Sequence, residues 1–531
     1  MAKATAAKLD PETPATADFP SQPRYVSVVK WIIGTAVFAY VLIRAFVLDP
    51  TADEVVGRLS YVDLLAVCDR PVEQAQLPSH LLGTVGADLL PFETYVSSRI
   101  LNALFIILFL YSANRVTRFI ASAPLQVLGF VTLICNVYVL DWFSLNRGYG
   151  QASAFAMTAF CFMAELMIRY RGKTMPGSAM FLATWSAAAA AMCNLAFLHF
   201  YVSFSAIVFL WVVNPPRLVA SWKPDSSLLA EIKRIVIDCQ YLFAAAAVLG
   251  AYVVPKFFIL RTRNLLYSGG TVGFVHDSVG TVLSNSLYRI RLTEVTVDLL
   301  AWTIVAMTVF MGAYNLLRRD ANDSRRISLL FFAGQIVHFA VVYSLHLTVD
   351  LNFIWHRGAI ALILLFAGQL CFFTASLGEK VMKSVFVVLS AIYAAIALYS
   401  ANLDYVLEQR MLSKQRKMLR DLEAIHEKTK QPILLGCSDT LKLKLNYFQE
   451  KWGLDWLQFY SIDMYVRFNR PYQIRPDTTH FYIWSRDGKF PEGLRSLPIE
   501  EVPDLDYPFT ESDLYQVKPD VKLADYLRLT K

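Results

Sequence analysis

The chain has 531 residues, of which 56% are hydrophobic and only 18% are charged. Together with a mean hydropathy of +0.41, this composition is typical of proteins that cross a membrane several times. The formal net charge of +7 is modest and no run of Lys and Arg alternates with aromatic residues, which argues against nucleic acid as a partner.

Eleven apolar segments approach the length of about 20 residues that a helix needs to cross a bilayer. They lie near 28–48, 99–118, 123–142, 150–168, 178–195, 197–213, 235–259, 297–317, 327–347, 358–377 and 384–401. Residues 1–27 are polar and rich in Pro and Ala, which predicts a disordered N-terminal segment and no cleavable signal peptide.

Lys and Arg gather in the short loops on one side of these segments. Because positive charge stays in the cytoplasm, the bias places the N-terminus inside and, after an odd number of spans, the C-terminus outside. The outer side then holds segment 49–98, the loops near 142–149, 260–296 and 348–357, and the tail from residue 402. The sequence therefore predicts an α-helical polytopic membrane protein of about eleven transmembrane helices.

The first outer segment begins with an acidic pair, Asp53 and Glu54. One interpretation is a general base that faces a cavity outside the cytoplasm. The other is a solvated pair that caps the next helix, whose dipole favours acids at its start. Apolar positions within 55–66 and 77–90 have helical spacing and predict two helices that lie on the membrane surface.

The loop after the third span reads Asp141-Trp142-Phe143-Ser144-Leu145-Asn146-Arg147-Gly148-Tyr149-Gly150. The glycines on either side of Tyr149 permit a tight turn in which backbones approach closely. Arg147 would then lie at the depth of lipid headgroups, where it suits a phosphate. A simple interfacial anchor of Trp and Arg explains the same residues without a substrate.

A late outer loop carries His346, Asp350, His356 and Arg357. The histidines are ten residues apart, which matches no metal-site spacing. Contact of His356 and Arg357 with a lipid phosphate is the more economical hypothesis, and an ordinary polar turn is the alternative.

Other polar residues lie singly along the outer side. Arg291, just before the eighth span, is a further candidate for phosphate contact, and His80 either lines the cavity or packs between surface helices. Arg44 lies near the outer end of the first span, and we expect its side chain to extend to the interface.

The tail, 402–531, has the length of an ordinary soluble domain. A helical stripe over 403–425 leads into it, Ile433–Leu435 is predicted as a strand that ends in a turn over 436–439, 441–452 as a helix and 480–484 as a strand. A small α/β domain is expected. Cys437 in this tail and Cys68 in the first loop are the two cysteines outside the spans, where a disulfide between them is conceivable.

In this order, the features resemble integral-membrane glycosyltransferases of the GT-C superfamily, which use polyprenyl-phosphate-linked sugars. The resemblance spans nearly all of the membrane part. It rests on Thr51-Ala52-Asp53-Glu54, on Gln76-Leu77-Pro78-Ser79-His80-Leu81-Leu82, on Ser98-Arg99-Ile100-Leu101-Asn102, on Phe143 to Gly150 and on Trp355-His356-Arg357-Gly358-Ala359.

The resemblance implies a GT-C-like catalytic domain over 28–401 and a soluble periplasmic domain over 402–531. It makes Asp53 the catalytic carboxylate, with Glu54 as a neighbour that shares the role. We expect the donor phosphate at Arg147, Tyr149, Arg291, His356 and Arg357, and the acceptor or cavity lining at His80, Asp141 and His346. No acidic metal set is apparent, so a reaction without metal or cofactor is favoured.

The expected protein is thus a glycosyltransferase of the bacterial inner membrane with a periplasmic active site. It would transfer sugar from undecaprenyl or decaprenyl phosphate to a glycan, lipid or protein acceptor. Two other classes stay open. A transporter or flippase of a lipid-linked saccharide would show repeats in matched halves, which the sequence lacks, and a non-catalytic scaffold of envelope assembly would have an inert Asp53.

Overall fold

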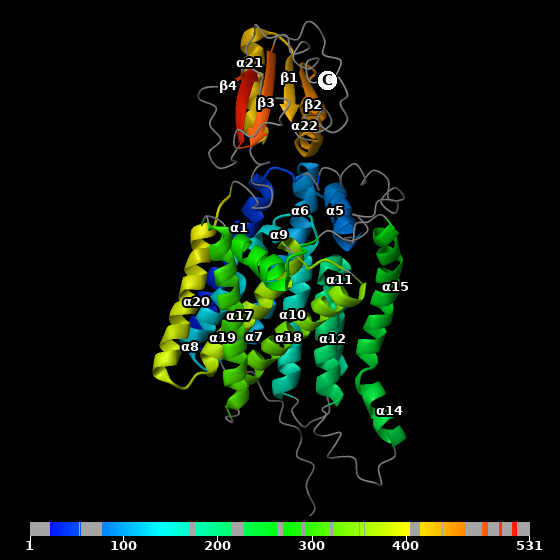
Figure 1. The fold of residues 1–531 in the computed structure, drawn as a ribbon, viewed down its shortest axis with the longest axis vertical. Helices are drawn as coiled ribbons and strands as arrows, with labels where there is room; N and C mark the ends of the chain where they lie inside the picture. The colour runs from blue at the N-terminus through cyan, green and yellow to red at the C-terminus, as the bar shows by residue number, and fades with distance from the viewer. Residues whose placement is uncertain are drawn as a thin grey trace, which may run out of the picture.

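In the computed structural model, the chain forms a bundle of helices with a smaller α/β domain at one end (Figure 1). We call this end of the bundle the outer end. The residues described are 22–51, 54, 77–169, 177–213, 228–262, 269–287, 290, 292–318, 322–349, 351–354, 356–403, 415–437, 439–461, 480–486, 499–501 and 512–517.

Nine helical segments of the described residues are long and apolar enough to cross a membrane. The most buried of them, α10 and α19, form the centre of the bundle. The helices of these nine segments are α1 (Arg24–Val47), α6 (Thr94–Ala103) continued by α7 (Phe105–Thr117), α10 (Tyr149–Arg169), η1 (Leu195–Phe197) continued by α12 (Leu198–Val213), α15 (Gln240–Thr262), α17 (Glu294–Leu317), α18 (Asp323–Val349), η3 (His356–Ala359) continued by α19 (Ile360–Ser376), and α20 (Lys380–Ser400).

The other two predicted spans are also helical but differ from the straight, full-length helices that we expected. The third consists of α8 (Ala123–Ile134) and α9 (Val137–Phe143), which meet at an angle of 61°. Asn136 lies at the break and accepts a hydrogen bond from the Val139 amide at 3.1 Å, which caps α9 and ends the straight helix. The fifth, α11 (Gly177–Cys193), is shorter than a typical span.

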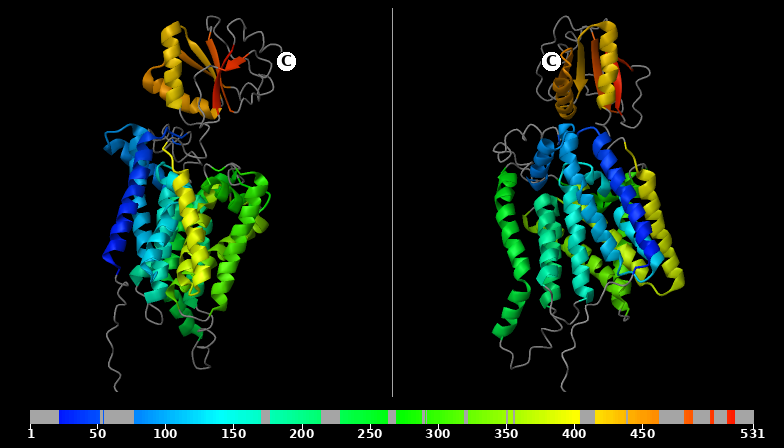
Figure 2. Two further views of the ribbon diagram at one scale, coloured as in Figure 1. Left: turned by 90° about the vertical axis from the view of Figure 1, so that its left-hand side faces the viewer. Right: turned by 180° about the vertical axis from the view of Figure 1, so that it is seen from behind.

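Short elements cover the outer end of the bundle. They are α5 (Leu77–Leu89), the π-helix η2 (Phe274–Gly280), α16 (Thr281–Ser286) and the 3-10 helices η1 and η3. The second predicted surface segment is helical, as α5, and its place on a membrane surface stays a prediction. The first, within 55–66, lies outside the described residues. Helix α14 (Leu228–Asp238) precedes α15 at the opposite end, and α1 also begins there (Figure 2).

Arg44 corrects one expectation. Instead of extending to the interface, its side chain is fully buried and forms an ion pair with Asp141 of α9, with 2.7 Å between Nη2 and Oδ1. A charge this far from water is stable only when it is paired and hydrogen-bonded. Tyr40 supplies a further acceptor for Nη1 at 2.7 Å, and the Asn402 carbonyl supplies another.

The C-terminal domain has a five-stranded sheet in the order β2-β1-β3-β5-β4. The central strand β1 pairs in parallel with β2 and β3, and β5 pairs antiparallel with β3 and β4. The strands are β1 (Ile433–Cys437), β2 (Leu457–Ser461), β3 (His480–Arg486), β4 (Ile499–Glu501) and β5 (Ser512–Val517), with helices α21 (Gln415–Thr429) and α22 (Asp439–Trp452).

The predicted α/β class of the tail is confirmed, and so are the strands at 433 and 480 and the helix at 441. The first strand is longer than predicted, because Gly436 and Cys437 continue it instead of forming a turn. Cys437 is buried in this strand, and Cys68, its conceivable disulfide partner, lies outside the described residues.

The C-terminal domain docks on the outer ends of α1 and α6. Arg416 of α21 forms an ion pair with Asp49, and Lys451 of α22 binds Glu93 at 2.7 Å. Between them the Tyr95 ring lies 6.4 Å from Tyr447 and packs within the apolar core of the domain. The domain is therefore held against the segment that leads from α1 to Glu54.

Candidate functional site

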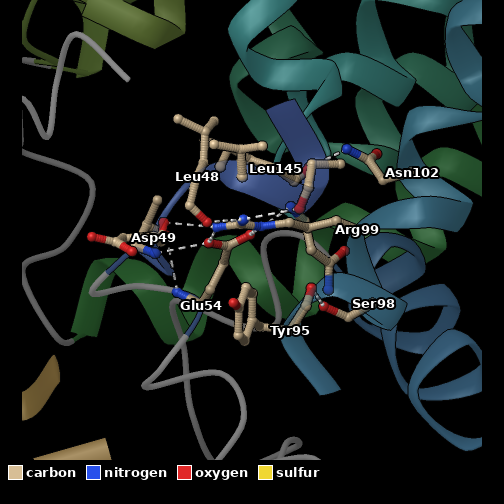
Figure 3. A network of polar contacts seen from close by, with 12 residues as sticks. Leu48, Asp49, Glu54, Tyr95, Ser98, Arg99, Asn102 and Leu145 are labelled. Carbon is tan, nitrogen blue, oxygen red and sulfur yellow. Dashed lines mark hydrogen bonds and ion pairs between the residues drawn. The ribbon is translucent and has the colours of Figure 1, made fainter. Parts of the chain in front are cut away.

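Arg99 of α6 is fully buried at the outer end and holds Glu54 in a two-pronged ion pair (Figure 3). Its Nε lies 2.8 Å from Glu54 Oε1, and its Nη2 lies 2.6 Å from Oε2. It also donates to the carbonyl oxygens of Leu48 at 2.8 Å and Asp49 at 3.0 Å. The planar guanidinium suits this fork, and it fixes the end of α1 to the start of the first outer segment.

The carboxylate of Glu54 accepts two further hydrogen bonds. Its Oε2 accepts from the Thr51 amide at 2.8 Å, and its Oε1 accepts from the Asn146 amide at 3.0 Å. Burial alone would raise the pKa of Glu54, but the charge and hydrogen bonds of Arg99, together with both amides, outweigh it and lower that pKa to about 2. The carboxylate is therefore ionised and fully bonded, which favours a structural role. A catalytic share for Glu54 stays a prediction.

Asp53, the predicted base, lies outside the described residues. It directly precedes Glu54 in the sequence, and the residues that bind Glu54 come from α6 and from the 141–150 turn. The contacts of Glu54 therefore join the residue that follows Asp53 in the sequence to α6 and to the 141–150 turn.

The 141–150 turn is bonded on several sides by buried polar side chains. Asn102 of α6 donates to the carbonyls of Leu145 and Trp142, the latter at 3.1 Å. Ser79 of α5 donates to Asn146 Oδ1 at 2.9 Å. These bonds join the turn to α5 and to α6.

Gly148 and Gly150 both occupy positions in this turn where a Cβ would meet backbone atoms, and Gly148 also has a left-handed backbone. The φ of Gly148 is +70°, and an added Cβ would clash with the Cys193 carbonyl oxygen at the end of α11. Asn194, which follows α11, donates to the Arg147 carbonyl at 3.3 Å. The close backbone approach that the two glycines predicted is confirmed at Gly148.

Arg147 and His80 are both almost completely buried at the junction of this turn with α5. Burial and the positive charge of Arg147 together lower the pKa of His80 to about 4. The imidazole is therefore neutral above that pH, and it offers a hydrogen-bonding group without adding a charge. Phosphate contact by Arg147 and acceptor contact by His80 stay predictions.

The late outer loop reaches the same turn through Arg357. Its guanidinium carbon lies 5.9 Å from the Trp142 ring and 5.9 Å from the Tyr149 ring, while those two rings are 4.7 Å apart. Such contacts hold the cation over aromatic faces. The side chain is half-buried, so the structure brings together two predicted phosphate-binding segments that are about two hundred residues apart.

His356 has a left-handed backbone, with φ of 47°. Its amide donates to Thr281 Oγ1 at 3.0 Å, and its Nδ1 lies 3.3 Å from the Asn285 amide nitrogen. A non-glycine residue with positive φ is uncommon and is held by its surroundings. Both partners belong to α16. His356 therefore binds α16, while the next residue, Arg357, packs on the 141–150 turn.

The remaining predicted residues lie elsewhere. Asp141 is fully buried in the ion pair with Arg44, and these contacts favour a structural role over cavity lining. His346, at the end of α18, bonds the Leu351 carbonyl through Nδ1 at 2.8 Å and stacks on Phe353. Arg291 lies outside the described residues. Their substrate contacts stay predictions.

Metal binding gains no support from the part of the chain that the structure describes. Within those residues no three His, Cys, Asp or Glu side chains come close enough to hold an ion.

An apolar cavity of about 300 Å³ lies beside α16. Its walls come from η2, α16, α17, α18 and α19, with Phe274, Leu283 and Phe339 among the apolar side chains. Its polar lining includes Asn136, which donates to Ser286 at 3.1 Å and to Tyr393 at 3.0 Å. Thr308, which donates to Gln335 at 3.2 Å, also lines it. Helix α16 therefore has the cavity on one side and His356 on another.

Polar residues of the site that were not singled out from the sequence include Asn194, Thr281 and Asn285. Their signal is weak, because single small polar residues also occur in spans for other reasons.

No family model matches the chain, and no curated protein matches it. Among solved structures, two crystal structures of ArnT from Cupriavidus metallidurans are similar to it. The apo structure has 12% sequence identity and a TM-score of 0.37, and the match covers 94% of this chain and 99% of that one. The structure bound to undecaprenyl phosphate has 10% identity and a TM-score of 0.36, with 94% and 98% covered.

Proposed function

We propose that the chain is a membrane glycosyltransferase that takes sugar from a polyprenyl-phosphate-linked donor. One observation carries the proposal. At the outer end, Glu54, which follows Asp53 in the sequence, meets the turn with Arg147, and Arg357 packs on the same turn. His356, next to Arg357, contacts α16, which lines an apolar cavity. A lipid-linked sugar needs this combination of a carboxylate, cations for its phosphate and an apolar path for its chain.

The phosphate of the donor would bind at Arg147, Arg357 and His356, with Tyr149 supporting Arg357 and with Arg291 as a further contact. The two buried or half-buried guanidiniums supply charge-assisted hydrogen bonds that are stronger than those in water. The part of the chain next to the phosphate would enter the cavity beside α16, whose apolar walls suit isoprene units.

In the proposed reaction, Asp53 takes the proton from a hydroxyl of the acceptor. The hydroxyl oxygen then bonds to the anomeric carbon, while the bond from that carbon to the phosphate oxygen breaks. The electron pair leaves with the polyprenyl phosphate, whose charge the arginines stabilise. Attack opposite to the leaving group inverts the anomeric configuration.

The acceptor would enter from the outer side, where the C-terminal domain covers the ends of α1 and α6. We propose that this side faces the bacterial periplasm, as the charge bias of the loops predicts. The acceptor is a glycan, lipid or protein, with His80, Asp141 and His346 as the predicted lining.

Asp53→Asn is expected to lower sugar transfer by about 10²- to 10⁴-fold, because the amide cannot accept the proton. The measurement is transfer from a panel of polyprenyl-phosphate sugars by purified protein in proteoliposomes. Asp88→Asn, which changes an exposed carboxylate on α5, is the matched control and should retain transfer. Undiminished transfer by Asp53→Asn contradicts the base, and translocation of donor without transfer supports a transporter. A folded wild type that does neither supports a scaffold.

Arg357→Met is expected to weaken binding of undecaprenyl phosphate by about tenfold or more, the usual contribution of one hydrogen bond to a charged group. Binding of the free lipid phosphate is measured by titration in detergent, so the result does not depend on the acceptor. Arg326→Met, at an exposed ion pair with Asp323 at the start of α18, is the control. Equal affinity in both variants argues against the phosphate site.

A further inference from the structure

Lys30 is a buried cation at the end of the bundle opposite to the C-terminal domain. It lies on α1, has only 2% of its surface exposed, and donates from Nζ to Thr117 Oγ1 at the end of α7 at 2.8 Å. The charge of Arg118 is close enough to repel it. A neutral hydroxyl does not balance a charge in an apolar setting.

No carboxylate among the described residues forms an ion pair with Lys30. The acid at this end of α10, Glu165, is held by Arg115, whose Nη2 donates to Glu165 Oε2 at 2.8 Å. Lys30 therefore carries a charge that no described carboxylate pairs with, and that charge favours an external anion.

Beside Lys30 lies a groove of about 300 Å³ between α1, α7 and α8. Trp31, Ile107 and Tyr111 line it and are 73%, 53% and 52% exposed, so they face the bilayer around the bundle. Gly34 also lines the groove. A Cβ at this position would meet Phe130 and Leu110 only at ordinary contact distance, so there is space above it. The groove is thus apolar, open towards lipid and cationic at Lys30.

We propose that this groove binds an anionic phospholipid, with an acyl chain along the apolar wall and the phosphate near Lys30. Basic pockets between membrane helices attract anionic headgroups in this way. The site is separate from the proposed donor site, which lies at the outer end, and it does not depend on the proposed enzymatic function.

Native mass spectrometry of delipidated protein with added lipid tests this proposal. Phosphatidylglycerol is the anionic probe, phosphatidylcholine the neutral one and undecaprenyl phosphate the rival. The wild type should prefer phosphatidylglycerol over phosphatidylcholine by about fivefold, the usual contribution of one cation at a membrane surface. Lys30→Met should lose that preference, and Lys256→Met, at a lysine of α15 that packs on Tyr252, should keep it.

Gly34→Leu provides a second test that leaves Lys30 charged. Its side chain would fill the groove, so binding of phosphatidylglycerol should fall at least as far as in Lys30→Met, and this variant decides the question alone if Lys30→Met does not fold. Unchanged preference in both variants overturns the proposal. So does a wild type that binds undecaprenyl phosphate better than phosphatidylglycerol with a loss of that binding in Gly34→Leu.

Discussion

Arg99→Met is expected to lower the free energy of unfolding by about 3–5 kcal/mol, the usual result of removing one partner of a buried ion pair. Glu54 would remain buried with a negative charge, and only the amides of Thr51 and Asn146 would still bind it. The carbonyls of Leu48 and Asp49 would also lose their donor. Denaturant unfolding of the detergent-solubilised protein measures the change.

A double substitution separates the stability of this ion pair from its positioning role. Arg99→Met with Glu54→Leu removes both charges, so the free energy of unfolding should return most of the way to wild type. If the ion pair also positions Asp53, the double variant will still transfer sugar slowly, with a lower kcat and a similar KM for the donor. Wild-type kcat in a stable double variant contradicts the positioning role.

The same ion pair connects the C-terminal domain to the proposed site. Tyr95 packs between Arg99, 5.2 Å from its ring, and Arg416 and Lys451 of the domain, at 5.8 and 5.6 Å. The Glu93 carboxylate has a lowered pKa because the Lys451 hydrogen bond and charge outweigh its partial burial. Contacts thus run without interruption from the domain to Glu54, whose neighbour is Asp53.

Much of the architecture could be predicted because the bilayer restricts it. Each of the eleven apolar segments lies on a helix, since only a helix satisfies its own backbone in lipid. The bend at Asn136 was not predicted, because hydropathy does not register one capping side chain. Strands β2, β4 and β5 were also missed, since their partners are set by the fold of the domain.

The candidate site was predictable as separate segments but not as pairs. The sequence identified Glu54, Arg147 and Arg357 by residue type and by the side of the membrane. It did not indicate that Arg99 binds Glu54, because the two are 45 residues apart. Charge pairing inside a bundle depends on which helices are neighbours, and the periodicity of one helix does not contain that information.

The second large effect is expected at the ion pair of Arg44 and Asp141, in which both side chains are completely buried. Arg44→Met leaves the Asp141 carboxylate without this cation in the interior and removes the donor to Tyr40. The Asn402 carbonyl loses one of its two donors and keeps Tyr40. We expect a loss of about 3–5 kcal/mol in the free energy of unfolding. The pair joins α1, α9 and the end of α20, so three parts of the bundle should loosen together.

Two other variants show whether the loss of unfolding free energy comes from this ion pair or from the loss of any arginine. Arg44→Met with Asp141→Leu should recover most of the stability, because an apolar pair of similar volume needs no compensation in lipid. Arg326→Met, at the exposed pair with Asp323, should cost at most about 1 kcal/mol. The sequence alone predicted an interfacial Arg44, for which Arg44→Met would be nearly neutral, so unfolding of this single variant decides between the two placements.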